Sequence, residues 1–227
     1  MNELTVELKN VSVKYRQLSL ESLEVEAVRD FTCTFEHGKI YGFIGRNGAG
    51  KTSLLSVVAG YRQASSGEVL VNGEPLFENS RYAAHINFVY QRSFDSEAVR
   101  DLRMKRYFKK AASYRPTFDM DYAHQLLEKF NVPLKKRMKH LSKGQQSAVC
   151  AIIGLASRCA LSIFDEVYLG MDAPSRDLFY RELLETQGRY PRIMVVSTHL
   201  ISEFDRRCLF VSKRFASKSK MTAVVVY

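Results

Sequence analysis

The sequence has few cysteines and no long uninterrupted apolar run, and both absences narrow the possible classes of protein. The cysteines are scattered with no C-x-x-C pair, which argues against a zinc site or a disulfide framework and favours a reducing cytosol. The longest apolar stretch, residues 148–164, is interrupted by Arg158, so we expect no segment to span a bilayer. Residues 1–7 are acidic and alternating where a signal peptide would be basic and then apolar, and we expect them to be retained. The four cysteines are Cys33, Cys150, Cys159 and Cys208.

The bulk composition is that of an ordinary folded protein. Of the 227 residues, 46% are hydrophobic and 26% are charged, without a low-complexity tract. This length predicts one compact domain over residues 1–227. With 34 Lys and Arg against 24 Asp and Glu, the net charge of +10 favours anionic partners: nucleotides, nucleic acid or an acidic membrane surface.

Hydrophobic periodicity in the first half of the chain predicts strands around a glycine-rich turn. Apolar residues alternate over residues 4–15, which predicts edge strands with one buried face, and a second strand pair is expected around residues 27–35. Residues 39–45 form a short apolar strand before the turn, and residues 51–60 continue at helical spacing.

The second half of the chain alternates between helix and strand patterns. A hairpin strand is expected at residues 69–73 and a further strand at 86–90. Residues 93–139 have helical spacing and predict a helical lobe, in which Asp119 marks a helix start. Strands at 160–164 and 193–197, separated by helical segments, predict a parallel sheet and an α/β fold.

A glycine-rich segment carries the strongest chemical signal. It matches the Walker A pattern G-x-x-x-x-G-K-[ST], whose glycines let backbone N–H groups converge on phosphate oxygens at a helix N-terminus. Lys51 is expected to neutralise the β and γ phosphates of a nucleotide, and Thr52 to bind Mg²⁺. The alternative, a tight turn without a ligand, is disfavoured by the flanking strand and helix. The candidate nucleotide-binding residues here are Gly45, Asn47, Gly48, Ala49, Gly50, Lys51, Thr52 and Ser53.

Two acidic residues directly follow the predicted strand that ends at Phe164. Mg²⁺ bound to a nucleotide needs a carboxylate near the phosphates, and Asp165 can hold it through water. Glu166 can polarise the attacking water, which is a general-base role. An Asp-Glu pair is also common in exposed loops, but the Walker A segment favours the catalytic interpretation.

Further segments resemble the ATP-binding cassette (ABC) proteins. Residues 141–145, LSKGQ, resemble the signature peptide LSGGQ and lie 24 residues before Asp165. Gln91, the D-loop-like residues 170–172 and His199 follow the family order, so the resemblance covers roughly residues 4–205. It implies a P-loop NTPase with a RecA-like parallel-sheet core, an antiparallel β subdomain and an inserted α-helical subdomain at about residues 93–146.

The resemblance also implies roles for single residues. Gln91 would contact Mg²⁺ or the attacking water and sense a membrane partner, and His199 would hold the γ-phosphate in the transition state. Without the family order, a core histidine would be the safer interpretation of His199. Tyr15 resembles the aromatic residue that stacks on adenine, although it could simply end an alternating strand. Asp172, in the D-loop-like segment, is a further nucleotide-binding candidate.

In this family the signature peptide closes over ATP held by the Walker A loop of a second copy. Ser142 is expected to be the N-cap of a helix over residues 145–156, which again places phosphate at a helix N-terminus. The implied assembly is a homodimer, or a heterodimer with a second ABC ATPase. The resemblance further implies MgATP hydrolysis for a transporter whose integral membrane subunits are separate chains, with this chain in the cytoplasm at the inner face of the cell membrane. The candidate trans residues are Ser142, Lys143, Gly144 and Gln145.

Three features depart from the family pattern. Lys143 replaces the first signature glycine, a change that we expect to be tolerated. Val167 stands where the family usually has proline, so the turn that aims Glu166 is expected to be looser and the activity lower. The last strand is poorly matched by residues 208–214, and residues 206–227 form a tail of uncertain structure.

Other functions within the superfamily are less well supported. DNA-repair and chromosome-organising members carry long coiled-coil or zinc-bearing insertions, and this sequence has neither sustained heptads nor paired cysteines. Ribosome-acting members normally carry two cassettes, whereas each motif occurs here once, so a nucleic-acid partner is disfavoured despite the net charge. A ribosome-associated or other soluble ABC ATPase is the alternative to a transporter subunit. Residues 168–180 and 190–203 resemble bacterial exporter ATPases, which favours export.

Overall fold

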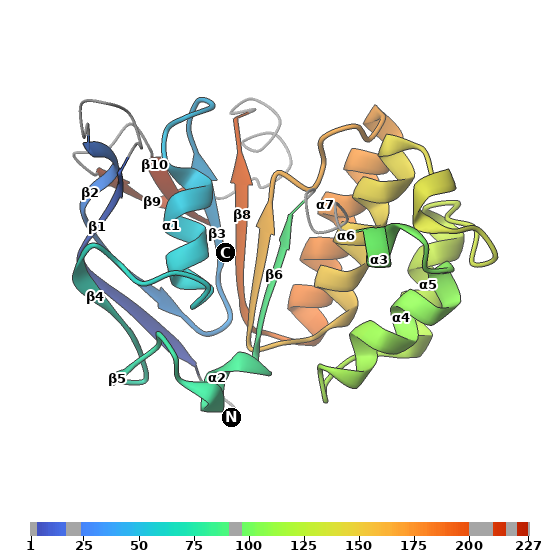
Figure 1. Cartoon of the computed structure of the whole chain (residues 1–227), viewed down its shortest axis with the longest axis horizontal. Coiled ribbons are helices and arrows are strands. Elements are labelled where there is room, and N and C mark those ends of the chain that lie inside the picture. Colours follow the sequence, from blue (N-terminus) through green and yellow to red (C-terminus); the bar gives the residue numbers. More distant parts are fainter. Residues whose placement is uncertain (1–3, 17–23, 91–96, 200–210, 217–221, 227) are drawn as a thin grey trace. The chain divides into compact units, whose positions relative to one another are not determined.

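The computed structural model describes residues 4–16, 24–90, 97–199, 211–216 and 222–226, which belong to two compact units (Figure 1). The first unit combines Met1–Ala83 with Ile193–Tyr227, and the second is Ala84–Arg192. Parallel and antiparallel pairing are both present, together with helices, as expected for a P-loop NTPase. The single domain over residues 1–227 stays a prediction.

The first unit contains an antiparallel sheet in the order β2-β1-β4-β5. Its strands are β1 (Thr5–Arg16), β2 (Glu24–Glu36), β4 (Ser66–Val71) and β5 (Glu74–Pro75). The expectation of edge strands at residues 4–15 was wrong, because β1 pairs with β2 on one side and β4 on the other. The expected strand pair around 27–35 is a single strand, β2. Alternation correctly indicated one buried face, but it carries no information about the number of hydrogen-bonded neighbours.

The same unit holds the strands that support the glycine-rich loop. β3 (Ile40–Ile44) and β8 (Ile193–Thr198) pair in parallel and are buried along their whole length, as their apolar sequences require. The helix α1 (Lys51–Val58) follows the loop, and the short helix α2 (Ser80–Ala83) closes this part of the chain. The poorly matched C-terminal tail supplies β9 (Val211–Ala216) and β10 (Thr222–Val226), and β10 pairs antiparallel with both β3 and β9.

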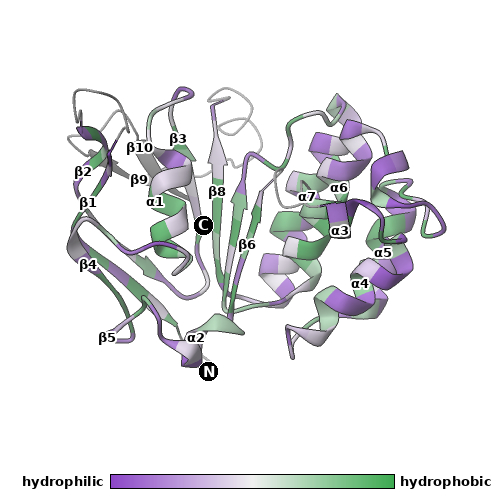
Figure 2. Ribbon diagram, in the orientation of Figure 1, coloured by the Kyte–Doolittle hydropathy of each residue, from purple (hydrophilic) through white to green (hydrophobic). Residues whose placement is uncertain are grey.

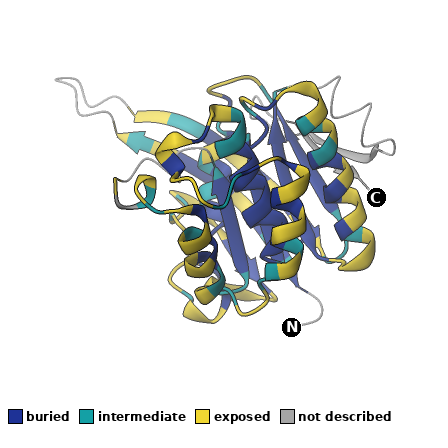
Figure 3. Cartoon of the chain, turned by 90° about the vertical axis from the view of Figure 1, so that its right-hand side faces the viewer, coloured by how far each residue is buried: buried dark blue, intermediate teal, exposed yellow. Residues whose placement is uncertain are grey.

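The second unit pairs two parallel strands and packs long helices beside them. β6 (Ile86–Tyr90) and β7 (Leu161–Asp165) lie next to α6 (Lys143–Ala156) and α7 (Ala173–Arg189) (Figure 1). A Cβ atom at Gly154 would lie 2.1 Å from a ring carbon of Phe164, so glycine allows α6 to approach β7 closely. The predicted helical lobe consists of α3 (Glu97–Arg100), α4 (Met104–Ser113), α5 (Met120–Lys129) and a 3₁₀ helix (Met138–His140). The strands are buried and the outer faces of the helices are exposed (Figure 3).

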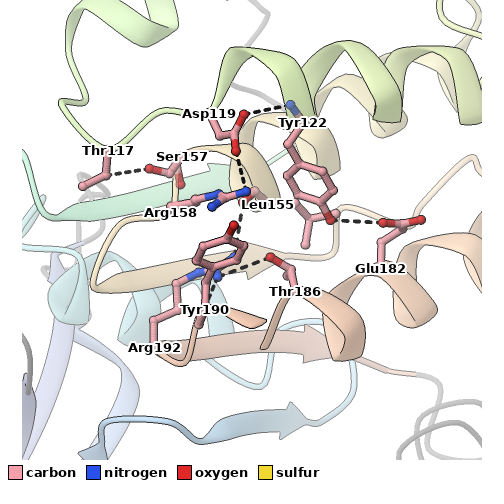
Figure 4. Close-up of polar contacts among 10 residues, drawn as sticks. All are labelled: Thr117, Asp119, Tyr122, Leu155, Ser157, Arg158, Glu182, Thr186, Tyr190 and Arg192. Atoms are coloured by element: carbon pink, nitrogen blue, oxygen red, sulfur yellow. Dashed lines mark hydrogen bonds and ion pairs between the residues drawn. The ribbon is translucent and has the colours of Figure 1, made fainter. Parts of the chain in front are cut away.

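A polar network ties the lobe to the C-terminal ends of α6 and α7 (Figure 4). The Thr117 hydroxyl donates to the Ser157 carbonyl at 2.7 Å, and the Tyr122 hydroxyl donates to Glu182 at 3.1 Å. Arg192, only 3% exposed, donates from Nη2 to the Leu155 carbonyl at 3.2 Å, and burial lowers its pKa to about 10. The bonds to the Ser157 and Leu155 carbonyls satisfy acceptors that the C-terminus of α6 leaves without intrahelical partners.

In the described ranges, no helix combines the length and the apolar character that crossing a membrane requires.

Candidate nucleotide site

The Walker A segment forms the loop between β3 and α1. The register pairs Ile44 with Thr198, and the Gly45 N–H donates to the Thr198 carbonyl at 3.2 Å, which fixes where the loop leaves the sheet. A tight turn follows, closed by the Ala49 N–H and the Arg46 carbonyl at 3.1 Å. Gly50 is the N-cap of α1 with φ 91°, so the loop runs directly into a helix N-terminus, where free N–H groups favour an anion.

Lys51 is a buried cation held within this loop. Its side chain is only 5% exposed, and Nζ donates to the Gly45 carbonyl at 2.6 Å and to the Arg46 carbonyl at 3.2 Å. A buried ammonium is costly unless it is hydrogen-bonded or paired with an anion. A positive charge inside a glycine-lined loop at a helix N-terminus therefore fits a phosphate group.

Tyr15 lies beside the start of α1. Its hydroxyl donates to Ser53 Oγ at 2.9 Å, and the guanidinium carbon of Arg62 lies 4.2 Å from the centre of its ring. Stacking of Tyr15 on adenine stays a prediction. The sequence reasoning missed Arg62, and no motif could have identified it, because its contact with Tyr15 depends on how β1 and the end of α1 meet.

His199 directly follows β8 and is half-buried. Because Thr198 pairs with Ile44 in the parallel register, His199 and Gly45 leave the sheet at the same edge. The first unit thus brings His199 to the start of the Walker A loop, and its contact with the γ-phosphate stays a prediction.

The acidic pair belongs to the second unit. Asp165 is the last residue of β7, is 5% exposed and stands opposite Tyr90 in the register with β6. Gln91, the residue after Tyr90, lies outside the described residues. The carboxylate of Asp165 is therefore fixed at the end of a buried strand.

Glu166 has an uncommon backbone conformation. Its φ of 50° is in the left-handed region, which disfavours residues with a Cβ atom, and such conformations are often found at functional sites. Its carbonyl accepts from the Leu169 N–H at 3.1 Å, and Val167 is fully buried. Ser147 of α6 donates to the Leu169 carbonyl. The turn is thus hydrogen-bonded without the family's usual proline, and the lower activity expected from Val167 stays a prediction.

The signature-like peptide begins α6 with a capping box. Ser142 Oγ accepts from the Gln145 N–H at 3.1 Å, and the Gln145 side chain accepts from the Ser142 N–H at 3.2 Å. The predicted N-cap is confirmed, although the helix begins at Lys143 and not at Gln145. Ser142 and Lys143 are both exposed.

The D-loop-like segment packs against this peptide. A Cβ atom at Gly144 would lie 2.8 Å from the Gly170 carbonyl oxygen, so Gly144 permits a close backbone approach. Asp172 is the N-cap of α7, and its carboxylate accepts from the Ser175 N–H at 2.9 Å. Hydrogen bonding to Ser175 lowers the pKa of Asp172. A capping role accounts for Asp172, and its nucleotide-binding role stays a prediction.

A parallel strand, a glycine-rich loop with a buried lysine and a following helix define a P-loop nucleotide-binding protein. The ABC transporter family model matches residues 28–168, more than half of the sequence, and the chain belongs to this family.

Relatives and solved structures agree with this assignment. The ABC transporter ATP-binding protein YtrB of Bacillus subtilis (strain 168) is 26% identical over 200 residues, which cover 86% of this chain and 66% of YtrB. The probable ABC transporter ATP-binding protein in the ycf23-apcF intergenic region of Cyanophora paradoxa is 30% identical over 227 residues, which cover 92% of this chain and 91% of that protein. The dimeric bacterial ABC transporter cassette MJ0796 has the same fold, with a TM-score of 0.73 at 18% identity over 86% of this chain and 88% of that one.

Proposed function

We propose that this chain is the ATP-binding and ATP-hydrolysing subunit of an ABC transporter. The observation that carries the proposal is the buried ammonium of Lys51 inside the glycine-lined loop at the N-terminus of α1. Charged donors hold phosphate oxygens more strongly than neutral ones do, and the loop N–H groups add to this attraction. Tyr15 stacks on the adenine ring.

The remaining residues are assigned to magnesium binding, activation of water and further nucleotide contacts. The hydroxyl of Thr52, the carboxylate of Asp165 and the amide of Gln91 are the oxygen ligands that Mg²⁺ prefers, and they would hold the ion. Mg²⁺, when bound, neutralises charge on the phosphates. Glu166 orients and polarises the attacking water, while His199 contacts the γ-phosphate. Asp172 completes the set of nucleotide contacts.

Two copies are proposed to act together. Ser142, Lys143, Gly144 and Gln145 would contact ATP held by the Walker A loop of a second copy, in a homodimer or a heterodimer with another ABC ATPase. The exposure of Ser142 and Lys143 supports this proposal, and the related cassette MJ0796 has been solved both as a dimer and as a dimer with ADP and Pi.

The partners are proposed to be integral membrane subunits on separate chains, which hold this subunit at the cytoplasmic face of the membrane. Export is favoured by the resemblance of residues 168–180 and 190–203 to exporter ATPases. The direction of transport has no other support. The relatives do not favour export, because they include a methionine import protein, MetN of Streptococcus pyogenes, at 26% identity over 212 residues.

Equilibrium binding of MgATP to the Lys51→Ala variant tests the proposal. Removing a charged hydrogen-bond donor should raise the dissociation constant about tenfold or more, since such bonds contribute about 1.5–3 kcal/mol. The matched control is Lys9→Ala, an exposed lysine of the same unit that pairs with Glu7 at 3.4 Å and should leave binding unchanged. Equal affinity of wild type and Lys51→Ala would exclude this loop as the phosphate site.

A further inference from the structure

Two segments of the helical lobe are rich in basic residues and poor in acidic ones. Residues 97–110 and 135–139 contain ten Lys and Arg against two acidic residues, a net charge of +8, compared with +10 for the whole sequence. All ten basic residues are exposed. We call them the basic surface: Arg100, Arg103, Lys105, Arg106, Lys109, Lys110, Lys135, Lys136, Arg137 and Lys139.

Backbone hydrogen bonds hold these two segments side by side. Arg103 and Arg137 form an antiparallel bridge. The Met104 N–H donates to the Lys136 carbonyl at 3.0 Å, and the Met138 N–H donates to the Leu102 carbonyl at 3.1 Å. Main-chain contacts therefore bring basic residues from distant parts of the sequence together despite their mutual repulsion.

The helix α4 presents its basic residues on one face. Lys105, Arg106, Lys109 and Lys110 span an arc of about 140°, because successive residues are about 100° apart around a helix. The buried residues Met104, Phe108 and Ala111 lie on the opposite side. Figure 2 shows the hydrophilic and hydrophobic parts of α4 in purple and green.

Most of this charge has no nearby counter-charge. In the first unit, Lys14 pairs with Glu24 at 3.5 Å and Arg81 with Glu74 at 2.8 Å. In the basic surface, Arg137 and Lys139 both pair with Asp101. Among the described residues, the other eight have no carboxylate within ion-pair distance, so the surface is well suited to an extended anionic partner.

We propose that the basic surface contacts anionic lipid headgroups of the membrane directly. A group of exposed cations, most of them without an ion pair among the described residues, matches a surface that offers many negative charges at once. Each Lys or Arg near such a surface adds to the attraction. Tyr114, 64% exposed at the C-terminal end of α4, is a side chain suited to the membrane–water interface.

Single-stranded RNA is the less favoured partner. Proteins that bind it without sequence preference place several aromatic rings where bases can stack. Of the lobe residues that the structure describes, Tyr114 is the one large aromatic with more than half of its surface exposed.

The location of the basic surface on the lobe agrees with the proposed function, in which the subunit works at a membrane. Lipid binding itself, however, requires no nucleotide.

Sedimentation with vesicles tests the proposal without nucleotide, at an ionic strength of about 0.15 M. The vesicles contain phosphatidylcholine alone or mixed with phosphatidylglycerol. A lobe variant combines Lys105→Gln, Lys109→Gln, Lys135→Gln and Lys136→Gln. A control variant of equal net charge combines Lys9→Gln, Lys14→Gln, Arg29→Gln and Arg81→Gln, whose native side chains all pair with carboxylates.

Wild type and control should bind the anionic vesicles, and the lobe variant should bind at least about tenfold more weakly, since each removed cation near the membrane contributes a factor of about five. Equal losses in both variants, no preference of wild type for anionic vesicles, or displacement from them by single-stranded RNA at equal phosphate concentration would overturn the proposal. MgATP binding measured on the same proteins checks that the variants are folded. If wild type binds vesicles but not MgATP, the proposed function fails and the lipid contact stands; if it binds MgATP but not vesicles, the reverse holds.

Discussion

Two glycines of the Walker A loop are required for different reasons. Both have positive φ, 78° at Gly48 and 91° at Gly50. A Cβ atom at Gly48 would meet nothing within 4 Å, whereas one at Gly50 would lie 2.2 Å from the Ala27 carbonyl oxygen in β2. Alanine at Gly48 would therefore suffer only backbone strain, while alanine at Gly50 would also force β2 and the loop apart.

This difference predicts unequal losses of stability. Gly48→Ala should lower the free energy of unfolding by about 1–2 kcal/mol, the cost of a left-handed backbone for a residue with a Cβ atom. Gly50→Ala should cost about 3 kcal/mol or more, because overlap with backbone is added to this strain. Urea denaturation of the two variants measures both values. Equal losses would show that Gly50 does not approach β2 as described.

For single residues, the sequence indicated which side chains to consider for a role, but not the backbone conformations or contacts of those residues. The motif drew attention to Lys51, which is buried in the loop, and the strand pattern to Asp165, which ends β7; their roles in binding phosphate and magnesium stay predictions. The left-handed backbone of Glu166 and the contact of Arg62 with Tyr15 could not be predicted. Both depend on how segments distant in sequence pack, and no local pattern encodes that.

Among the secondary-structure elements, α6 has one residue, Ser142, with both a structural role and a proposed functional role. Ser142 caps the helix through its hydroxyl, and the same exposed residue is proposed to face the ATP of a second copy. Aspartate is as good an N-cap as serine, but its negative charge would repel a phosphate. Substitutions at Ser142 can therefore separate the two roles.

Ser142→Ala should lower the free energy of unfolding by about 1 kcal/mol through loss of the cap, and Ser142→Asp should leave it nearly unchanged. In a Glu166→Gln background, where hydrolysis is expected to be blocked, MgATP should double the mass measured by light scattering. Adding Ser142→Asp should abolish that doubling although the helix stays capped. A Ser142→Asp protein that dimerises as readily as its parent would contradict the trans role.

Strand positions were easier to predict than strand partners. The ranges of β3, β6 and β8 agree with the sequence prediction to within one residue at every end, because their apolar runs are bounded by turns or polar residues. The interior position of β1 and the pairing of the tail strand β10 with β3 were not foreseen. Both depend on contacts between distant segments, which alternation does not encode.

For the whole molecule, the candidate residues divide between the two units. Tyr15, the Walker A loop and His199 belong to the first, whereas Asp165, Glu166 and the signature-like peptide belong to the second. The first unit is proposed to bind the nucleotide and the second to supply the group that activates water. We infer that the chain is an ATPase in which nucleotide binding and hydrolysis can be separated by substitution.

Phosphate release from MgATP by the Glu166→Gln variant tests whether hydrolysis can be removed without loss of binding. The amide removes the proposed base and leaves Lys51, Thr52 and Asp165 in place. Release should fall about 100-fold or more, since general-base catalysis contributes about 10²–10⁴, while MgATP binding persists. The matched control is Glu185→Gln, an exposed carboxylate of α7, which should release phosphate at the wild-type rate. Release by Glu166→Gln at the wild-type rate would show that Glu166 is not the base that activates water.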